Sequence, residues 1–389
     1  MREKLPRSLP PKIANKLKSN VKPPLRQPMP RRRVKKAFTK TQQRKKEHLE
    51  LCLDTPSVTS RFGTGLDRYS FVHNALPELD IDEIDVSAKF LGTQLQAPIL
   101  ISSMTGGFAL ARQVNRNLAA AAQCLGIAMG VGSQRVAIEE PSVADSFEVR
   151  DVAPDILLLS NLGAVQLNYG YTVDHCRKAI EMIGANGLIL HLNVLQEAVQ
   201  PEGNRNFKGL SEKITHVCRQ LEVPVVVKEV GSGISAKVAG RLKQAGVKAI
   251  DVAGRGGTSW YAVEAQRAAK RGKPAETTFA DWGIPTEEAL VAVRQAVPDL
   301  EIVASGGIRS GLDIAKCISL GADVGAFGQP LLAAALESPE KVIEFIRRII
   351  YEIKVTMLCV GAKNLDALKK TPLARRSTDS FEAKVGHGR

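Results

Sequence analysis

The segment HisLeuAsnValLeuGlnGlu, residues 191–197, carries the most groups able to do chemistry in a short stretch of this chain. It closes an apolar run typical of a strand, and alternation along a strand puts His191 and Asn193 on one face. Glu197 offers a hard oxygen ligand of the kind that Mg²⁺ takes, with water and substrate phosphate completing the shell. A single histidine is more often a satisfied core residue. Its combination with Asn193, Gln196 and Glu197 favours a functional site in which His191 takes part.

Two later strand ends carry backbone suited to a phosphate. SerGlyGlyIleArgSerGly at 305–311 precedes a stretch of helical spacing, so its N–H groups are expected near the positive end of a helix. Glycine lets the chain approach a phosphate closely. An ordinary tight turn would explain one such run, but two at neighbouring strand ends favour a phosphate site. Its expected members are Gly306, Gly307, Ile308, Arg309, Gly328 and Gln329.

Lys228 closes the apolar run 223–227, and alternation puts it on the face of Val226. A lysine at the end of a barrel strand usually points into the site. Two other interpretations stay open: a surface lysine at a frayed end, or the ion-pair partner of a neighbouring carboxylate.

A doubly phosphorylated ligand would also need fixed positive charge. Arg44, Lys45 and Arg135 are the candidates, with His191 able to assist. Arg44 and Lys45 would then fold over the site as a lid. Alternatively, they only continue the basic segment that precedes them.

Apart from Arg44 and Lys45, these residues end or follow short apolar runs, and eight such strand-and-loop units alternate with stretches of helical spacing. Runs bounded by Gly and polar residues are typical of parallel strands buried on both faces. Eight rounds favour a (β/α)₈ barrel, an α/β fold that gathers all loops on one rim, over an open sheet. The strands are expected at 97–102, 126–131, 155–159, 187–192, 223–227, 248–252, 301–304 and 322–326, and helices at 108–125, 172–185, 208–221, 234–245, 284–297 and 311–320.

The net charge of +14 is concentrated at one end. Residues 1–46 hold 17 Lys and Arg against one acidic residue, so the remainder is nearly neutral. We expect a disordered, Pro-rich arm at 1–40, a segment with a substrate-binding lid at 41–94, the barrel at 95–370 and a flexible tail at 371–389. The arm is either solvated, or a targeting segment, or a loose contact for polyanions. No specific nucleic-acid binding is expected.

Six scattered cysteines without a CxxC pair argue against disulfides or a zinc site, and a reduced cytoplasmic setting is expected. No apolar stretch reaches the roughly 18 residues that span a membrane.

Seven motifs occur in an order that is similar to that of the type 2 isopentenyl-diphosphate isomerases. They are ArgLysLysGluHis, SerSerMetThrGlyGly, GlyValGlySerGlnArg, SerAsnLeuGlyAla, HisLeuAsnValLeuGlnGlu, GlyGlyThrSerTrp and SerGlyGlyIleArg, and they span roughly residues 40 to 365.

This resemblance implies an FMN enzyme of the barrel fold that interconverts isopentenyl diphosphate and dimethylallyl diphosphate, with NADPH reducing the flavin and no net oxidation. Reduced FMN would supply and remove protons at the alkene. Protonation makes a tertiary cation, which a dry pocket with Trp260 and the flavin face could stabilise. The family assigns Glu197 to Mg²⁺ and Gln196 to the substrate, and it forms tetramers and octamers. Lys228 would contact the flavin. Further flavin contacts are expected from Ser103, Met104, Thr105, Gly106, Ser133, Asn161 and Thr258.

Two departures and two alternatives remain. Ala253 stands where the family commonly has Ser, and Gly328 where Ala is frequent. One alternative is a nucleic-acid or membrane-tethered protein that works through the basic arm, with the barrel as a scaffold. The other is an FMN-dependent oxidoreductase of the 2-hydroxy-acid dehydrogenase type, or a nucleotide-processing relative, which shares the barrel and the phosphate turn. Such an enzyme is expected to place a catalytic His or Cys in the later loops, and no histidine lies between residues 217 and 386.

Overall fold

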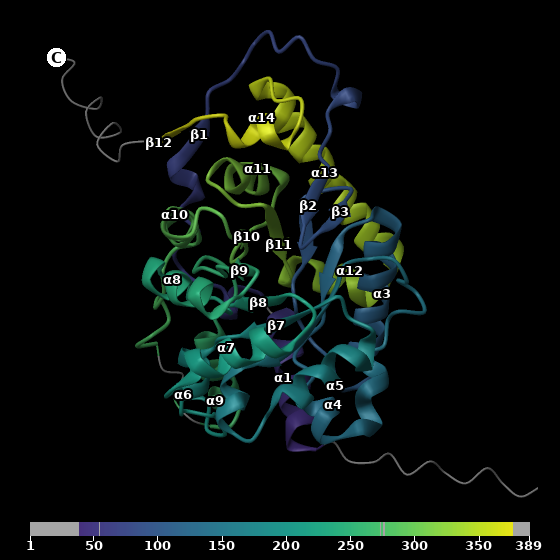
Figure 1. Ribbon diagram of the computed structural model, residues 1–389, viewed down its shortest axis with the longest axis vertical. Coiled ribbons are helices and arrows are strands. Elements are labelled where there is room, and N and C mark those ends of the chain that lie inside the picture. Colours follow the sequence, from purple (N-terminus) through teal and green to yellow (C-terminus); the bar gives the residue numbers. More distant parts are fainter. Residues whose placement is uncertain (1–38, 54, 273, 275–276, 376–389) are drawn as a thin grey trace, which may run out of the picture. The chain divides into compact units, whose positions relative to one another are not determined.

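The computed structural model describes residues 39–375, apart from 54, 273 and 275–276. Eight parallel strands close into a barrel in the order β10-β11-β4-β5-β6-β7-β8-β9 (Figure 1). The barrel predicted from the sequence is therefore confirmed, with a strand at each expected place. These strands are β4 (Ile99–Ile101), β5 (Ala128–Gly130), β6 (Leu158–Gly163), β7 (Gly187–His191), β8 (Val225–Lys228), β9 (Ala249–Asp251), β10 (Glu301–Ala304) and β11 (Val324–Phe327).

Strand β6 differs from its expected bounds of 155–159. It begins later and includes residues 160–163, which the sequence suggested as a loop. The reason is its pairing with β7, in which the register continues to Gly163 opposite His191. The Ser160 hydroxyl also donates to the Gly187 carbonyl and so stays within the ladder.

The six helices expected between the strands are all present. They are α3 (Ala109–Leu125), α5 (Val173–Ile183), α7 (Leu210–Gln220), α8 (Ala236–Ala245), α10 (Thr286–Ala296) and α11 (Gly311–Ser319). Local sequence explains their ends: Gly126 ends α3 in the left-handed conformation, and Ser310 with Asp313 forms a capping box on α11. The other helices are α1 (Lys40–Leu53), α2 (Thr55–Val58), α4 (Arg135–Glu139), α6 (Val194–Val199), α9 (Trp260–Ala269), α12 (Leu332–Glu337), α13 (Pro339–Val360) and α14 (Leu365–Lys369).

A hairpin of β2 (Ala88–Phe90) and β3 (Thr93–Leu95) packs at the amino ends of the barrel strands. Phe90 and Leu95 are buried in the same apolar cluster as the side chains inside the barrel, and the Leu91 N–H donates to the Glu301 carboxylate where β10 begins. Burying a side chain like Phe90 contributes about 1.5–3 kcal/mol. The interior is thus filled and closed at this end, which leaves the carboxyl ends of the strands for a site.

The expected arm at 1–40 and tail at 371–389 lie almost wholly outside the described residues. Two elements at their borders are described. Helix α1 begins at Lys40, and β12 (Leu373–Arg375), within the segment expected to be a flexible tail, pairs antiparallel with β1 (Tyr69–Phe71). Hydrogen-bonded pairing fixes this part of the expected tail.

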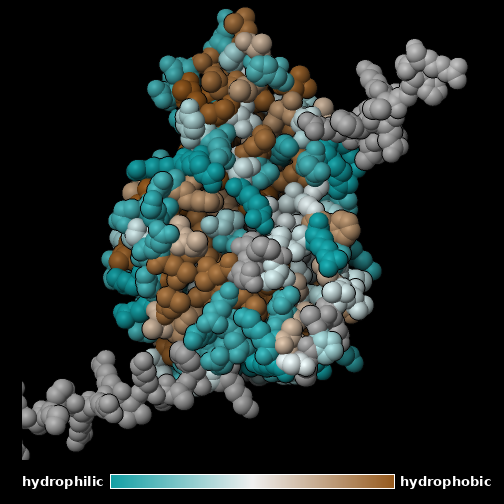
Figure 2. All heavy atoms as spheres, turned by 180° about the vertical axis from the view of Figure 1, so that it is seen from behind, coloured by the Kyte–Doolittle hydropathy of each residue, from teal (hydrophilic) through white to brown (hydrophobic). Residues whose placement is uncertain are grey.

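The surface is of mixed polarity. On the face shown in Figure 2, apolar side chains gather near mid-height and are bordered by hydrophilic ones. In the part of the chain that the structure describes, no helix is both long and apolar enough to cross a bilayer.

Candidate active site

Near the carboxyl ends of the strands, polar side chains replace the apolar filling of the barrel. The interior cluster includes Leu159, Ile189, Val226, Ala249 and Val303. Two residues further along each chain segment, and therefore on the same face, stand polar residues. They are Asn161, His191, Lys228, Asp251 and Ser305. Strand alternation alone thus builds a polar floor.

A cavity of about 280 Å³ opens above this floor. Every residue expected in the site lines it, with one exception. Gly106 does not line it. A Cβ there would lie 2.7 Å from Phe147 Cδ1, so the glycine makes room for that ring, and its contact with a cofactor stays a prediction. The expected residues that line the cavity are Arg44, Lys45, Ser103, Met104, Thr105, Ser133, Arg135, Asn161, His191, Asn193, Gln196, Glu197, Lys228, Thr258, Gly306, Gly307, Ile308, Arg309, Gly328 and Gln329, and Trp260 joins them.

Lys228 lies at the centre of the floor and forms an ion pair. Its Nζ is 2.8 Å from Asp251 Oδ2, and the side chains are 9% and 2% exposed. The Ser305 hydroxyl donates to Asp251 Oδ1 at 2.6 Å, and the Ala253 N–H donates to the same oxygen at 3.2 Å. Lys228 therefore lines the cavity and also pairs with a carboxylate. The sequence had offered these as alternatives, a lysine that points into the site or the ion-pair partner of a carboxylate.

His191 is neutral in this environment. Its Nδ1 lies 2.8 Å from Asn161 Oδ1. Burial, reinforced by the nearby charges of Lys228 and Lys45, lowers the pKa of His191 to about 4. The lowered pKa favours a neutral imidazole in the free protein, and the assistance of His191 in binding a diphosphate stays a prediction.

Glu197 lies on α6, with both carboxylate oxygens held. Asn193 Nδ2 donates to Oε1 at 3.0 Å, and the Asn204 N–H donates to Oε2. Asn193 Nδ2 is also 3.3 Å from Gln196 Oε1, so these three residues form one cluster. Among the described residues, no three or more His, Cys, Asp and Glu side chains are grouped to hold a metal ion. Glu197 would therefore contribute the only carboxylate from this cluster.

Helix α1 brings positive charge to the cavity from outside the barrel. Lys45 Nζ donates to the Ser133 carbonyl at 2.7 Å and lies 5.1 Å from the centre of the Phe147 ring. Burial and then the neighbouring Arg44 lower the pKa of Lys45 to about 7. Two residues after Ser133, Arg135 binds Glu139 at 2.7 Å and Asn204 at 2.9 Å.

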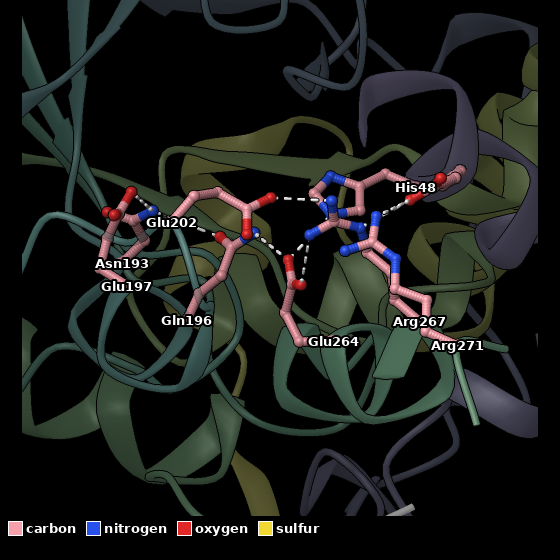
Figure 3. A network of polar contacts seen from close by, with 9 residues as sticks. His48, Asn193, Gln196, Glu197, Glu202, Glu264, Arg267 and Arg271 are labelled. Atoms are coloured by element: carbon pink, nitrogen blue, oxygen red, sulfur yellow. Dashed lines mark hydrogen bonds and ion pairs between the residues drawn. The ribbon is translucent and has the colours of Figure 1, made fainter. Parts of the chain in front are cut away.

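An ion network that the sequence did not reveal joins α1 to α9 (Figure 3). Arg267 is 5% exposed and binds Glu47 and Glu202 at 2.7 Å and Glu264 at 3.2 Å. Burial opposes its charge, but the hydrogen bonds that Arg267 donates to Glu47 and Glu202 prevail and raise the pKa of Arg267. Glu264 also contacts His48 Nε2 at 2.8 Å and Gln196 Nε2 at 3.5 Å. The network therefore ends beside Gln196, one of the residues predicted to bind the substrate.

Glycines let the loops after β9 and β10 pack backbone against backbone. Gly306 has φ +100°, and a Cβ on it would lie 2.6 Å from the Gly254 nitrogen. A Cβ on Gly257 would lie 2.6 Å from the Gly307 nitrogen. Among the described residues, the N–H groups of Gly306, Gly307 and Ile308 find no hydrogen-bond partner.

The helix end itself differs from expectation. Asp313 accepts from the N–H groups of Arg309 and Ser310, the Ser310 hydroxyl accepts from the Asp313 N–H, and Glu352 accepts from the Gly311 N–H. The start of α11 is thus already capped. The donors available to an anion are those of the loop, not of the helix, and side-chain capping explains the difference.

Two buried side-chain oxygens at the cavity, Ser103 Oγ and Asn193 Oδ1, also lack a partner within the described residues. Buried polar groups of this kind are rarely left unpaired in proteins. They are consistent with a polar ligand completing the site.

Comparison with known proteins gives two kinds of likeness. The family model for FMN-dependent dehydrogenases matches residues 192–375. An isopentenyl-diphosphate delta-isomerase from Nostoc sp. is 50% identical over 337 residues, which is 86% of this chain and 96% of the relative. That from Xanthobacter autotrophicus is 51% identical over 332 residues, 85% and 97% of the two chains.

Solved structures share the fold at lower identity. A mandelate oxidase variant has a TM-score of 0.60 at 18% identity, covering 85% of this chain and 95% of the other. A lactate oxidase from Pediococcus acidilactici has a TM-score of 0.58 at 16% identity, covering 86% and 94%. This likeness extends to the barrel architecture alone.

Proposed function

The chain belongs to the isopentenyl-diphosphate delta-isomerase family, and we propose that it interconverts isopentenyl diphosphate and dimethylallyl diphosphate in the cavity at the carboxyl ends of its barrel strands. The observation that carries this is that two groups of residues suited to anions line one cavity. One is the glycine cradle at Gly306 and Gly307, and the other is the cluster of Arg44, Lys45 and Glu197.

The first anion site fits the phosphate of FMN. Unpaired N–H groups at Gly306, Gly307 and Ile308 would hold it, and a side chain at either glycine would close the approach. The unpaired Ser103 hydroxyl and the Lys228 ammonium would hold the ring. Thr105, Asn161 and Thr258 would complete its hydrogen bonds. When bound and reduced, FMN supplies the acid and base chemistry at the alkene.

The second anion site fits a diphosphate with Mg²⁺. Glu197 supplies a hard oxygen ligand, and the two phosphates would supply others. Arg44, Lys45 and Arg135 would neutralise the diphosphate from the rim, with Arg135 exchanging part of its contact to Glu139 or Asn204 for the ligand. This placement leaves the hydrocarbon end over the floor.

The reaction moves one proton onto the terminal carbon and removes one from the carbon next to the diphosphate-bearing carbon, so the double bond shifts and nothing is oxidised. We propose that His191, held by Asn161, and Gln196, held by Asn193, orient the substrate as neutral hydrogen-bonding groups. Trp260, which packs edge-on against His48 with ring centres 5.1 Å apart, would exclude water and face the developing cation.

The oxidoreductase alternative is less favoured. A 2-hydroxy-acid dehydrogenase needs a base that takes the substrate's proton, and the chain has no histidine between residues 217 and 386. The solved oxidases share only the fold at 16–18% identity.

The finer properties of the enzyme are proposed from the family resemblance. They are NADPH as the reductant, a homo-oligomer of four or eight chains, and a cytoplasmic setting. For the basic arm we propose no role in catalysis. Removal of residues 1–39 is expected to leave turnover intact and to abolish any binding of the protein to heparin, which stands for a general polyanion.

One experiment tests the proposal directly. Purified protein is incubated anaerobically with FMN, dithionite, Mg²⁺ and isopentenyl diphosphate, and the products are separated by chromatography. Dimethylallyl diphosphate should form only with reduced FMN. Absence of the allylic product, from protein that has taken up FMN, would overturn the assignment.

A further inference from the structure

Asp251 is a buried charge that the proposed reaction does not use. It ends β9, next to β8 in the barrel, with Lys228 opposite it in register. Its carboxylate is held from three sides, by Lys228 Nζ at 2.8 Å, the Ser305 hydroxyl at 2.6 Å and the Ala253 N–H at 3.2 Å. Asp251 does not line the cavity, whereas both Lys228 and Ser305 do. It therefore touches the site only through other residues.

The charges around this pair come from three elements. His191 on β7 lies within the field of Lys228, and so does the buried Glu229 that follows β8. Lys45 on α1 acts on His191 from above. Glu229 points elsewhere, because one of its oxygens accepts the N–H groups of Val230, Gly231 and Ser232. Asp251 is thus the carboxylate that opposes Lys228 directly.

We propose that Asp251 is a positioning residue that fixes the Lys228 ammonium at the cavity, where it would contact a bound flavin, and cancels most of its charge, and so sets how strongly the site would favour the anionic form of reduced FMN. This inference deepens the proposed function and rests on it.

The physical argument is electrostatic. Reduction of FMN to its anionic form takes up two electrons and one proton, and a second proton at ring nitrogen N1 gives the neutral reduced form. A lone cation beneath the ring would stabilise the anion and oppose that second proton. With Asp251 2.8 Å from Lys228, the ring faces a dipole of zero net charge. The pair therefore leaves N1 more basic than a lone lysine would.

Three variants distinguish this electrostatic role from a purely structural contribution of Asp251 to the fold. Asp251→Asn keeps the shape and an acceptor oxygen but removes the counter-charge. Lys228→Met removes the cation. The double variant removes both charges, and so leaves neither buried without its partner. The measured quantity is the midpoint potential of bound FMN by spectroelectrochemistry between pH 6 and 9.

The expected outcome has a sign for each variant. Asp251→Asn raises the potential by about 30 mV or more, which is a tenfold change for a two-electron couple. In a plot of potential against pH, the slope changes at a certain pH, and Asp251→Asn should shift that pH to a lower value. Lys228→Met lowers the potential, and the double variant returns towards the wild type. Loss of support alone would give no such recovery.

A matched control is Glu287→Gln. Glu287 is equally buried and paired, with Arg68 at 2.7 Å and Tyr69 at 2.6 Å, but it lies on α10 outside the cavity. The Glu287→Gln variant should have a lower free energy of unfolding and an unchanged midpoint potential of bound FMN. If Asp251→Asn does not retain FMN, comparison of Lys228→Met with the double variant carries the test, since adding Asp251→Asn must still raise the potential.

The inference is overturned if Asp251→Asn, or its addition to Lys228→Met, leaves the potential unchanged or lowers it. Failure of the proposed function looks different: the wild-type protein would then bind no FMN or form no allylic product.

Discussion

Diphosphate binding should take up a proton at Lys45. Burial and Arg44 lower the pKa of this ammonium from its ordinary 10.5 to about 7, with Glu139 opposing them weakly. A bound diphosphate brings negative charge towards the ammonium and so favours the protonated form. Above pH 7, most of the free protein has a neutral amine that must be protonated before it can pair with the ligand.

The size of the effect follows from the two pKa values. Below pH 7 both free and bound protein hold the proton, so affinity does not change with the charge of Lys45. With the ordinary pKa of 10.5 restored by the bound diphosphate, only the bound state holds the proton between pH 7 and 10.5, and the Kd for isopentenyl diphosphate should rise roughly tenfold per pH unit. From pH 7 to pH 9 the Kd should therefore increase roughly 50-fold, and binding at pH 8 should take up about 0.9 proton.

Isothermal titration calorimetry in two buffers of different ionisation enthalpy measures this proton uptake. Lys45→Arg is the matched variant, because arginine stays charged over the whole range. It should bind at pH 8 with nearly no proton uptake and with a flat pH dependence. His191, whose pKa is about 4, is present in both proteins and so does not affect the comparison. Equal uptake in wild type and Lys45→Arg, or none in the wild type, would refute the argument.

Three further substitutions test separate parts of the site. Glu197→Gln should raise the Mg²⁺ concentration needed for half-maximal turnover by at least tenfold, because the variant loses a hard oxygen ligand. The FMN absorbance of the purified protein should stay unchanged. An unaltered dependence of turnover on Mg²⁺ would show that Glu197 is not a ligand of the metal ion. Gly306→Ala places a Cβ 2.6 Å from the Gly254 nitrogen at φ +100° and should weaken FMN binding at least tenfold by equilibrium dialysis, whereas Gly240→Ala on α8, with open space around it, should stabilise the fold by up to about 1 kcal/mol. Arg267→Met leaves Glu47, Glu202 and Glu264 without their shared cation and should cost about 3–5 kcal/mol in urea denaturation, an expectation that a loss below 1 kcal/mol would contradict.

The barrel could be predicted because its signals are local. Each strand is a short apolar run with polar residues at its end, and those ends must share a rim once the sheet closes. The floor was predictable for the same reason: His191 and Lys228 follow interior residues by two positions. Asp251 shares this signal, two residues after Ala249, and the same rule would have found it.

The Arg267 network could not be predicted in this way. Its members come from α1, α6, α9 and the loop after α6, and no spacing in the sequence links Glu47 to Arg267. Helix α9 places Glu264 and Arg267 three residues apart on one face, but that pattern is typical of any solvated helix. Only the packing of α1 against α9 shows that this face is buried and ends beside Gln196.

The distribution of charge in the cavity suits an isomerisation through a cation. Positive charge is expected at the rim, where Arg44, Lys45 and Arg135 meet the diphosphate. A lone cation in the floor would oppose a carbocation formed in the cavity. Because Asp251 pairs with Lys228 at 2.8 Å, the two side chains together add no net charge to the floor. We therefore propose that the Lys228–Asp251 pair serves an isomerisation that develops positive charge on the substrate.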